Sequence, residues 1–544
     1  MDPGVYDVVV CGTGIVESLL ACALSQSGSR VLVVDSQEDY GGRRHGMRWE
    51  EFNDLVARKT FLGPDSTLPS EETGQAVLRD LHIVDTSICS TTEEGLLHGI
   101  VAESKRFNME LNNKLLFASG EMLEVLLHSG VYRYLEFVAL DSIFFLAEGH
   151  LAPIPFSKGE IYQSKDLTMV EKRMIMKFLQ FAVDWGRYHA GRDSRTLNER
   201  DLTSERQLHR PQNKKDFLSY GYDIEGYIER PFVEFLDHCR ITPQLKDIIV
   251  YSLALQSHDS TPTRQALQEL FLHMDSLGRY GSTAFLYPHF GSSELYQAFS
   301  RMSAVWGCTQ MLRTAVRSIA FEEDKIRMTL TNNEIVMCRH LIASSSEWRH
   351  EKQAHGLVVT RTSLCSKELL PVKESGSSML VLPPNSAEIG NQQAIFVVQH
   401  GAASNTVSKQ TFVVRMSTKC RGMNICEESD VLGRAFQFLT KLSVFSDEIQ
   451  MASITSTCPI WKSPFDLPSN VHLCGHHDDV LHYEGAVAEA REIFHHIHPE
   501  KVFFEKKEDS ILDEVYRPEL DTLETALDIL DKDDIVGNTE EKEQ

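Results

Sequence analysis

The chain has 544 residues, and its 42% hydrophobic and 24% charged residues are typical of a globular protein. This composition excludes collagen-like, low-complexity and wholly disordered chains. The net charge of −24 argues against non-specific binding to nucleic acid, which needs a basic surface, and anionic membranes would repel a chain this acidic.

No apolar run is long enough for a transmembrane helix, and no signal peptide precedes the first predicted strand. The eleven cysteines form no CxxC pair, a pattern typical of free thiols in a reducing compartment. We therefore expect a cytoplasmic protein of the cytosol.

A βαβ unit opens the chain. Residues 5–10 and 31–34 are short β-branched runs that predict two buried strands, and residues 15–25, rich in Leu and Ala, predict the helix between them. A unit of this kind begins a dinucleotide-binding fold. The sequence therefore predicts an α/β fold of the FAD/NAD(P)-binding kind.

The turn of this unit carries a degenerate dinucleotide fingerprint. Gly12 and Gly14 match the first two glycines of G-x-G-x-x-G, and Asp35 is the acid that closes the second strand. Glu17 stands at the third glycine position, where its carboxylate would take the place of the pyrophosphate. We therefore expect the fold without FAD or NAD; the alternative is that Glu17 only stabilises the first turn of its helix.

A second motif favours a flavin. Gly41-Gly42-Arg43 resembles the start of the GGR motif of flavin amine oxidases. An FAD-dependent oxidoreductase therefore stays open as an alternative function.

The middle of the chain divides into polar and apolar stretches. Residues 43–104 are mostly polar and predict an insertion on the surface. Thr168 and Glu171 form a capping box that opens an apolar helix. Residues 190–216 predict a loop, and the strongly acidic residues 507–544 predict a disordered tail.

A predicted helix that starts at Ser292 or Ser293 is amphipathic. Its apolar stripe, which we expect to face the core, comprises Leu295, Ala298, Phe299 and Met302. Another face carries polar residues of mixed charge: Glu294, Gln297 and Arg301. This face is either solvated surface or a docking platform for a protein with matching charges.

Motifs for catalysis and metal binding do not appear. The histidines between His472 and His482 match the spacing of no zinc module, so we expect no metal site. The sequence lacks the motifs of serine hydrolases, P-loop NTPases and zincins. We expect no catalytic residue.

Three sequence blocks carry a family resemblance. The first comprises residues 6–14, 17–18, 31–35 and 40–42; the second 106–111, 116–120 and 132–137; the third 277–281, 285–288, 291, 294–295, 301–304 and 307. In these blocks the chain resembles the superfamily of Rab escort proteins and Rab GDP-dissociation inhibitors, relatives of flavoproteins that have lost flavin. It departs from the family pattern at Asp39, Tyr296 and Cys308.

The resemblance implies a domain plan. A large FAD/NAD(P)-binding-like domain with mixed sheets would comprise residues 1–150 and 257–506, and a smaller all-helical domain would be inserted at 158–256. It also implies no cofactor and a platform that binds the switch regions of GDP-bound Rab GTPases. The platform positions of the family fall on Tyr40, Glu294, Gln297, Arg301 and Thr309, with Met311 on the adjoining loop.

The length of the chain, the insertions and the form of Arg106-Phe107-Asn108 favour the escort branch. An escort protein presents newly made Rab to the geranylgeranyl transferase heterodimer and carries the prenylated product to membranes, with only transient membrane contact. The helical domain would contact the transferase and accept the geranylgeranyl lipid. For the transferase contact the sequence offers Phe232 and Phe235, provided that they are exposed; helical-core packing is the favoured interpretation of both.

Overall fold

The computed structural model describes residues 4–42, 45–58, 82–88, 100–147, 149–156, 158–193, 218–322, 325–344, 354–373, 376–409, 411–420, 425–442, 449–461, 468–475 and 480–505. Within them the chain forms two compact units. Unit 1 combines Met1–Leu151 with Phe285–Ser510, and unit 2 is Ala152–Ala284. The predicted tail at 507–544 and most of the predicted loop at 190–216 lie outside the described residues.

The first sheet of unit 1 contains the predicted βαβ unit. Its strand order is β10-β11-β12-β1-β2-β9, and β18 pairs with β12. The strands are β1 (Gly4–Cys11), β2 (Val31–Val34), β9 (Thr309–Met311), β10 (Val316–Phe321), β11 (Ile326–Leu330), β12 (Ile335–Ser344) and β18 (Val471–Cys474). The β1 strand lies between two parallel neighbours, β12 and β2. Strands buried in this way carry continuous apolar runs, as Val8-Val9-Val10 does.

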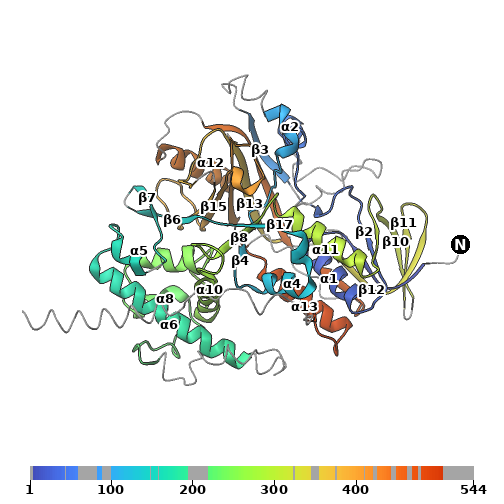
Figure 1. Ribbon diagram of the computed structural model, residues 1–544, viewed down its shortest axis with the longest axis horizontal. Coiled ribbons are helices and arrows are strands. Elements are labelled where there is room, and N and C mark those ends of the chain that lie inside the picture. Colours follow the sequence, from blue (N-terminus) through green and yellow to red (C-terminus); the bar gives the residue numbers. More distant parts are fainter. Residues whose placement is uncertain are drawn as a thin grey trace, which may run out of the picture. The chain divides into compact units, whose positions relative to one another are not determined.

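Four helices pack together beside this sheet (Figure 1). They are α1 (Ile15–Gln26), α4 (Glu121–Ser129), α11 (Ser293–Val305) and α13 (Glu484–Ile497). The α1 helix contacts both α11 and α13, and every residue from Ile15 to Ser25 is buried. The predicted strands at 5–10 and 31–34 and the predicted helix at 15–25 are therefore confirmed.

A second sheet of unit 1 has the order β3-β17-β13-β16-β15-β14-β6-β7, and its core is covered by α12 (Ile425–Leu442). Its strands are β3 (His82–Ile88), β6 (Ser142–Ala147), β7 (His150–Pro153), β13 (Ala354–Cys365), β14 (Ser377–Leu382), β15 (Ile395–His400), β16 (Phe412–Cys420) and β17 (Gln450–Trp461). A small third sheet joins β4 (Leu116–Phe117), β8 (Phe285–Pro288) and β5 (Phe137–Ala139). Unit 1 is thus a mixed α/β structure.

The expectation of a surface insertion at 43–104 is wrong for part of that range. Helix α2 (Trp49–Arg58) buries Trp49, Phe52 and Val56 in a core cluster, and β3 pairs with β17. These three residues follow one another at i, i+3 and i+7, the spacing of a buried helix face. The abundance of polar residues around them hid that signal.

Unit 2 is built mainly from helices. They are α5 (Lys158–Gln163), α6 (Met169–Asp193), α8 (Phe232–His238), α9 (Pro243–Asp247), the π-helix η5 (Ile248–Leu253) and α10 (Thr263–Ser276). The unit extends past residue 256 because α10 packs against α6 and α8. None of the helices in the described part of the chain has an apolar stretch that would cross a bilayer.

The start of α6 confirms the predicted capping box. The Glu171 backbone N–H donates to Thr168 Oγ1 at 3.3 Å, and Glu171 Oε2 accepts from the Thr168 backbone N–H at 3.0 Å. Burial alone would raise the pKa of Glu171, but the hydrogen bonds that its carboxylate accepts from the Thr168 backbone N–H and from the Thr242 and Thr168 hydroxyls hold the pKa below its ordinary value. Because donors at a helix start have no partner within the helix, the box fixes where α6 begins.

The structure confirms core packing for Phe232 and Phe235, and the suggestion that they are exposed transferase contacts is wrong. Both are buried, with 1% and 0% of their surface exposed, in an aromatic cluster of unit 2. Phe178 lies 6.3 Å from Phe232 and 6.2 Å from Phe235 between ring centroids, and Phe181 and Tyr222 complete the cluster. Burial of large rings stabilises a small helical core, so these two side chains pack inside the unit and are not available as surface contacts.

Candidate functional site

The amphipathic pattern of α11 is realised in the structure. Its apolar stripe of Leu295, Ala298, Phe299 and Met302 lies in the core cluster that also contains α1. Gln297 and Arg301 are exposed and Glu294 is half-buried, so the polar face points away from that core. The helix therefore presents charges of both signs on a rigid support.

Arg301 is oriented by an aromatic ring that sequence patterns do not reveal. Its guanidinium carbon lies 4.6 Å from the ring centroid of Tyr134, the last residue of the 3-10 helix η4 (Val131–Tyr134). A cation over an aromatic face is attracted by the ring's quadrupole. Tyr134 is itself 37% exposed, so the pair lies at the surface and positions the arginine without hiding it.

Tyr40 is joined to α11 through Gln310. The Tyr40 hydroxyl donates to Gln310 Oε1 at 2.7 Å, and Gln310 Nε2 donates to the Ser300 carbonyl at 2.7 Å and to Ser303 Oγ at 2.8 Å. Burial raises the pKa of Tyr40, and nearby Cys308 raises it further. The structure therefore brings the loop after β2, the edge strand β9 and α11 together.

Thr309 and Met311 flank Gln310 on β9. Because successive side chains of a strand point to opposite faces, these two lie on the other face from Gln310. Thr309 is exposed, whereas Met311 packs against the apolar cluster of the sheet's far side, with Leu32 and Val34. The structure thus groups Tyr40 with the α11 face and places Met311 beneath the sheet edge.

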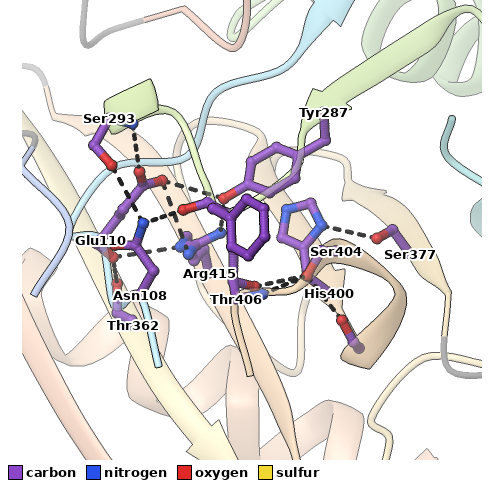
Figure 2. Close-up of polar contacts among 12 residues, drawn as sticks. Asn108, Glu110, Tyr287, Ser293, Thr362, Ser377, His400, Ser404, Thr406 and Arg415 are labelled. Atoms are coloured by element: carbon purple, nitrogen blue, oxygen red, sulfur yellow. Dashed lines mark hydrogen bonds and ion pairs between the residues drawn. The ribbon is translucent and has the colours of Figure 1, made fainter. Parts of the chain in front are cut away.

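A buried polar network holds the N-terminus of α11 from below (Figure 2). Glu110 Oε1 accepts from the Ser293 backbone N–H at 2.9 Å, and Glu110 Oε2 accepts from the Tyr287 hydroxyl at 3.2 Å. Arg415 Nη2 lies 3.9 Å from the same carboxylate, and Arg415 Nη1 donates to the Tyr287 hydroxyl at 3.1 Å. All three side chains of this network, Glu110, Tyr287 and Arg415, are at most 1% exposed.

Burial shifts the pKa of the ionisable side chains in and beside this network. Desolvation raises the pKa of Glu110, while the Arg415 guanidinium acts in the opposite direction. Burial lowers the pKa of His400, which stacks on Tyr287 with ring centroids 3.9 Å apart, and Arg415 lowers it further. The pKa of Glu294 on the platform is raised by its partial burial and by nearby Glu110. The network thus reaches the outer face electrostatically as well as through the helix backbone.

The turn before α1 shows whether a dinucleotide would fit. An added Cβ at Gly14 would lie only 2.5 Å from Glu17 Oε2, so the Glu17 carboxylate folds over the glycine turn. Asp35 Oδ2 accepts from Thr13 Oγ1 at 2.6 Å, and Thr13 Oγ1 accepts from the Gly41 backbone N–H at 3.0 Å. Since the chain's own side chains take the places of pyrophosphate and ribose, these residues do not fit FAD or NAD in this arrangement.

The flavin-like glycine pair has a packing role here. Gly41 has φ of +100°, and an added Cβ would lie 2.7 Å from Cδ2 of the buried Tyr296 ring. Arg43, the third residue of the motif, lies outside the described residues. Among the residues that the structure describes, no group of three His, Cys, Asp or Glu side chains could hold a metal ion.

The comparisons with known proteins fit this geometry. The profile of the GDP dissociation inhibitor family matches residues 1–68 and 96–509. The chain belongs to the GDP dissociation inhibitor family. The family resemblance predicted from the three sequence blocks is therefore confirmed.

Named relatives come from both kinds of protein in this family. The human Rab proteins geranylgeranyltransferase component A 1 is 24% identical over 94% of each chain. Rab escort protein 1 of Arabidopsis thaliana is 28% identical over 77% of each chain. The crystal structure of a Rab GDI from Plasmodium falciparum superposes with a TM-score of 0.66 at 19% identity, covering 92% of this chain and all of that one. This last similarity supports the mixed α/β fold of the GDP dissociation inhibitor family.

Proposed function

We propose that this chain is a Rab escort protein. It binds newly made GDP-bound Rab GTPases, presents them to the Rab geranylgeranyl transferase heterodimer, and delivers the prenylated Rab to membranes. The chain performs no chemistry itself, because its contribution is to hold one protein in front of another.

One observation carries this proposal: exposed Gln297 and Arg301 and half-buried Glu294 share one face of α11, whose N-terminus is held by a hydrogen bond to the buried Glu110 carboxylate. A rigid face with charges of both signs suits recognition of a complementary protein surface, because little side-chain and backbone freedom is lost on binding. Tyr40 extends the face through Gln310. Thr309 and Met311 add the neighbouring strand edge, with Met311 as a support of that edge.

The escort branch is favoured by the share of both chains that aligns with a component A relative. The human component A relative aligns over 94% of both chains, so the similarity includes nearly the whole length of each protein. The alternative is a Rab GDP-dissociation inhibitor that extracts and recycles prenylated Rab. The two functions share the Rab platform and differ in the need for the transferase.

Lipid shielding belongs to the proposal as well. We assign the geranylgeranyl group and the transferase contact to helical unit 2, with Phe232 and Phe235 excluded as surface contacts by their burial. A geranylgeranyl group carries about twenty carbons, and burial contributes about 0.8 kcal/mol per CH₂. Shielding of this size is sufficient to keep a prenylated protein in solution.

A reconstituted prenylation assay tests the function. It combines a Rab that ends in two cysteines, the transferase heterodimer and labelled geranylgeranyl diphosphate, with and without this chain. Lipid transfer that depends on the chain supports the escort protein. No transfer despite tight binding to prenylated GDP-bound Rab would assign the chain to the inhibitor branch.

Substitution of the platform arginine tests the site. We expect Arg301→Ala to weaken Rab binding by more than about 1 kcal/mol, as for a central charged contact. Arg317→Ala is the matched control, because Arg317 is an exposed arginine on β10 that bonds Asn333 away from α11. Titration calorimetry with GDP-bound Rab measures both, and equal affinities for the two variants would refute the platform.

The oxidoreductase alternative has its own test. If the Glu17 carboxylate occupies the turn, purified protein incubated with FAD and then desalted shows no flavin absorbance. Retained flavin would reverse this expectation and revive the oxidoreductase.

A further inference from the structure

The turn that leads into α11 contains an unusual aromatic residue. Phe290 has φ of +67° and is 52% exposed, and it immediately precedes Gly291, whose φ is +105°. Residues other than glycine rarely adopt this left-handed region, and Asn and Asp are enriched among those that do. A bulky ring held outward in this conformation is unfavourable twice, through its backbone and through its exposed apolar surface.

Three contacts from distant segments impose this conformation. The Phe290 backbone N–H donates to the Ser404 carbonyl at 3.0 Å, and the Phe290 carbonyl accepts from Asn108 Nδ2. The neighbouring His289 Nδ1 lies 2.9 Å from Asn405 Nδ2. The backbone of the turn is therefore fixed on both sides by the surrounding structure, and so is the direction in which the Cα–Cβ bond of Phe290 leaves it.

The same contacts join the turn to the platform. Asn108 Nδ2 also lies 3.2 Å from Ser293 Oγ, and Ser293 is the first residue of α11. Gly291 is packed closely, since an added Cβ there would lie 2.7 Å from Glu110 Oε1. One set of side chains, Asn108 and Glu110, thus fixes both the aromatic turn and the start of the helix that carries Glu294.

We propose that Phe290 is an aromatic anchor of the Rab-binding surface, inserted into an apolar depression of the GTPase beside the surface that meets Glu294. This inference rests on the proposed function and extends its site. Interface hot spots combine aromatic residues with arginine, surrounded by polar contacts that exclude water. Because the backbone of this turn is already fixed, little backbone freedom is lost on binding, which increases the contribution of the ring to affinity.

The alternative is that the ring supports the fold, and the two roles predict opposite results for one variant. In Phe290→Asn the backbone keeps its left-handed conformation, because Asn tolerates it, while the ring is removed. An anchor predicts about tenfold weaker binding to GDP-bound Rab with an unchanged or higher midpoint of thermal unfolding. A structural ring predicts a lower midpoint.

The experiment compares wild type, Phe290→Asn, Phe290→Tyr and Arg301→Ala by titration calorimetry and thermal unfolding. Phe290→Tyr keeps the ring, and we expect it to bind within about twofold of wild type. Wild-type binding by Phe290→Asn together with weak binding by Arg301→Ala would overturn the anchor and leave the platform intact. Absence of Rab binding by the wild type, or full binding by Arg301→Ala, would instead count against the proposed function.

Discussion

Two turns of unit 1, before α1 and before α11, have similar local structures. They differ in whether a carboxylate covers the turn or leaves the outer face of the following helix exposed. In each, a buried strand ends in a turn with a glycine at φ of +105°, Gly12 or Gly291, and a helix follows with a carboxylate at its start. At α1 the carboxylate is Glu17 of the helix itself, and it folds over the turn. At α11 it is Glu110, which comes from a segment 183 residues earlier and binds from below.

The segment that supplies the carboxylate determines whether the turn is covered or the helix face stays exposed. Glu17 occupies the place where a ligand's phosphate would meet the N-terminus of α1, and α1 is buried from Ile15 to Ser25. Glu110 accepts its hydrogen bond from the Ser293 backbone N–H on the buried side of α11, so Gln297 and Arg301 stay exposed. Glu17, which belongs to α1 itself, therefore covers the turn before that helix. Glu110, which comes from another segment, holds the start of α11 and leaves its outer face exposed.

A third helix gives an intermediate case. Glu484 Oε2 accepts from the backbone N–H of Glu121, the first residue of α4, at 2.6 Å. This carboxylate is also supplied by a distant segment. Burial raises its pKa from the ordinary value of 4.5 to about 7, and the opposing effects of His482 and of the Glu121 backbone N–H are smaller.

Removal of the two carboxylates should give the largest contrast. We expect Glu110→Ala to lower the free energy of unfolding by about 3–5 kcal/mol, because Arg415 remains buried without its partner. Glu17→Ala should lower it by about 1 kcal/mol, the contribution of an acid in the first turn of a helix. Urea denaturation measures both, and equal losses would show that the two turns do not differ in this way.

Alanine substitutions at Gly12 and Gly291 distinguish the cost of backbone strain from the cost of close packing in the free energy of unfolding. Both positions have the same φ, so Gly12→Ala and Gly291→Ala share a backbone strain of about 1–3 kcal/mol. At Gly12 the nearest atom to an added Cβ is 3.8 Å away, whereas at Gly291 it is 2.7 Å away and belongs to the fixed Glu110 carboxylate. Gly291→Ala should therefore lose about 2 kcal/mol more in the same denaturation experiment.

The raised pKa of Glu484 makes stability depend on pH. A carboxyl whose folded pKa lies above its unfolded value contributes most below about pH 4.5, and this contribution is lost as the pH rises to about 7. Relative to Glu484→Gln, wild type should therefore lose roughly 2–3 kcal/mol of unfolding free energy across that interval. A constant difference between the two proteins from pH 4.5 to 7 would contradict this assignment.

The smallest expected effect concerns the ring beneath Arg301. Tyr134→Leu removes the cation–π contact and should weaken Rab binding about threefold, while Tyr134→Phe keeps the ring and should bind nearly as wild type. Surface plasmon resonance at low protein density can resolve this difference. Equal affinities for the Leu and Phe variants would show that Tyr134 does not position the arginine.

Features that depend on residues close together in the sequence were predictable from it. The period of 3.6 residues identified the two faces of α11, the capping box at Thr168 identified the start of α6, and the substituted fingerprint at Glu17 indicated a turn that does not suit a dinucleotide. Each of these rests on residues within a few positions of one another.

Long-range pairings were not predictable in this way. The bond from Ser293 to Glu110, the ion pair with Arg415 and the bridge through Gln310 each join segments whose proximity is decided by the complete fold. The partners of Phe232 and Phe235 could not be predicted either. Their short stretch of sequence does not reveal that the rings of Phe178 and Tyr222, from other segments, pack against them. Trp49 and Phe52 were missed because their neighbours in sequence are polar.

The position of β1 between two neighbours has a consequence for synthesis on the ribosome. Gly4 lies opposite Val336, so the first strand receives one of its partners only after most of the chain has been translated. At about 10 residues per second, roughly half a minute separates the two strands during elongation. Throughout that interval the run Val8-Val9-Val10 has an open edge that could pair with other nascent chains, and a prematurely terminated product without β12 would keep this edge exposed. The N-terminal strand is therefore the segment where we expect association between nascent chains to begin.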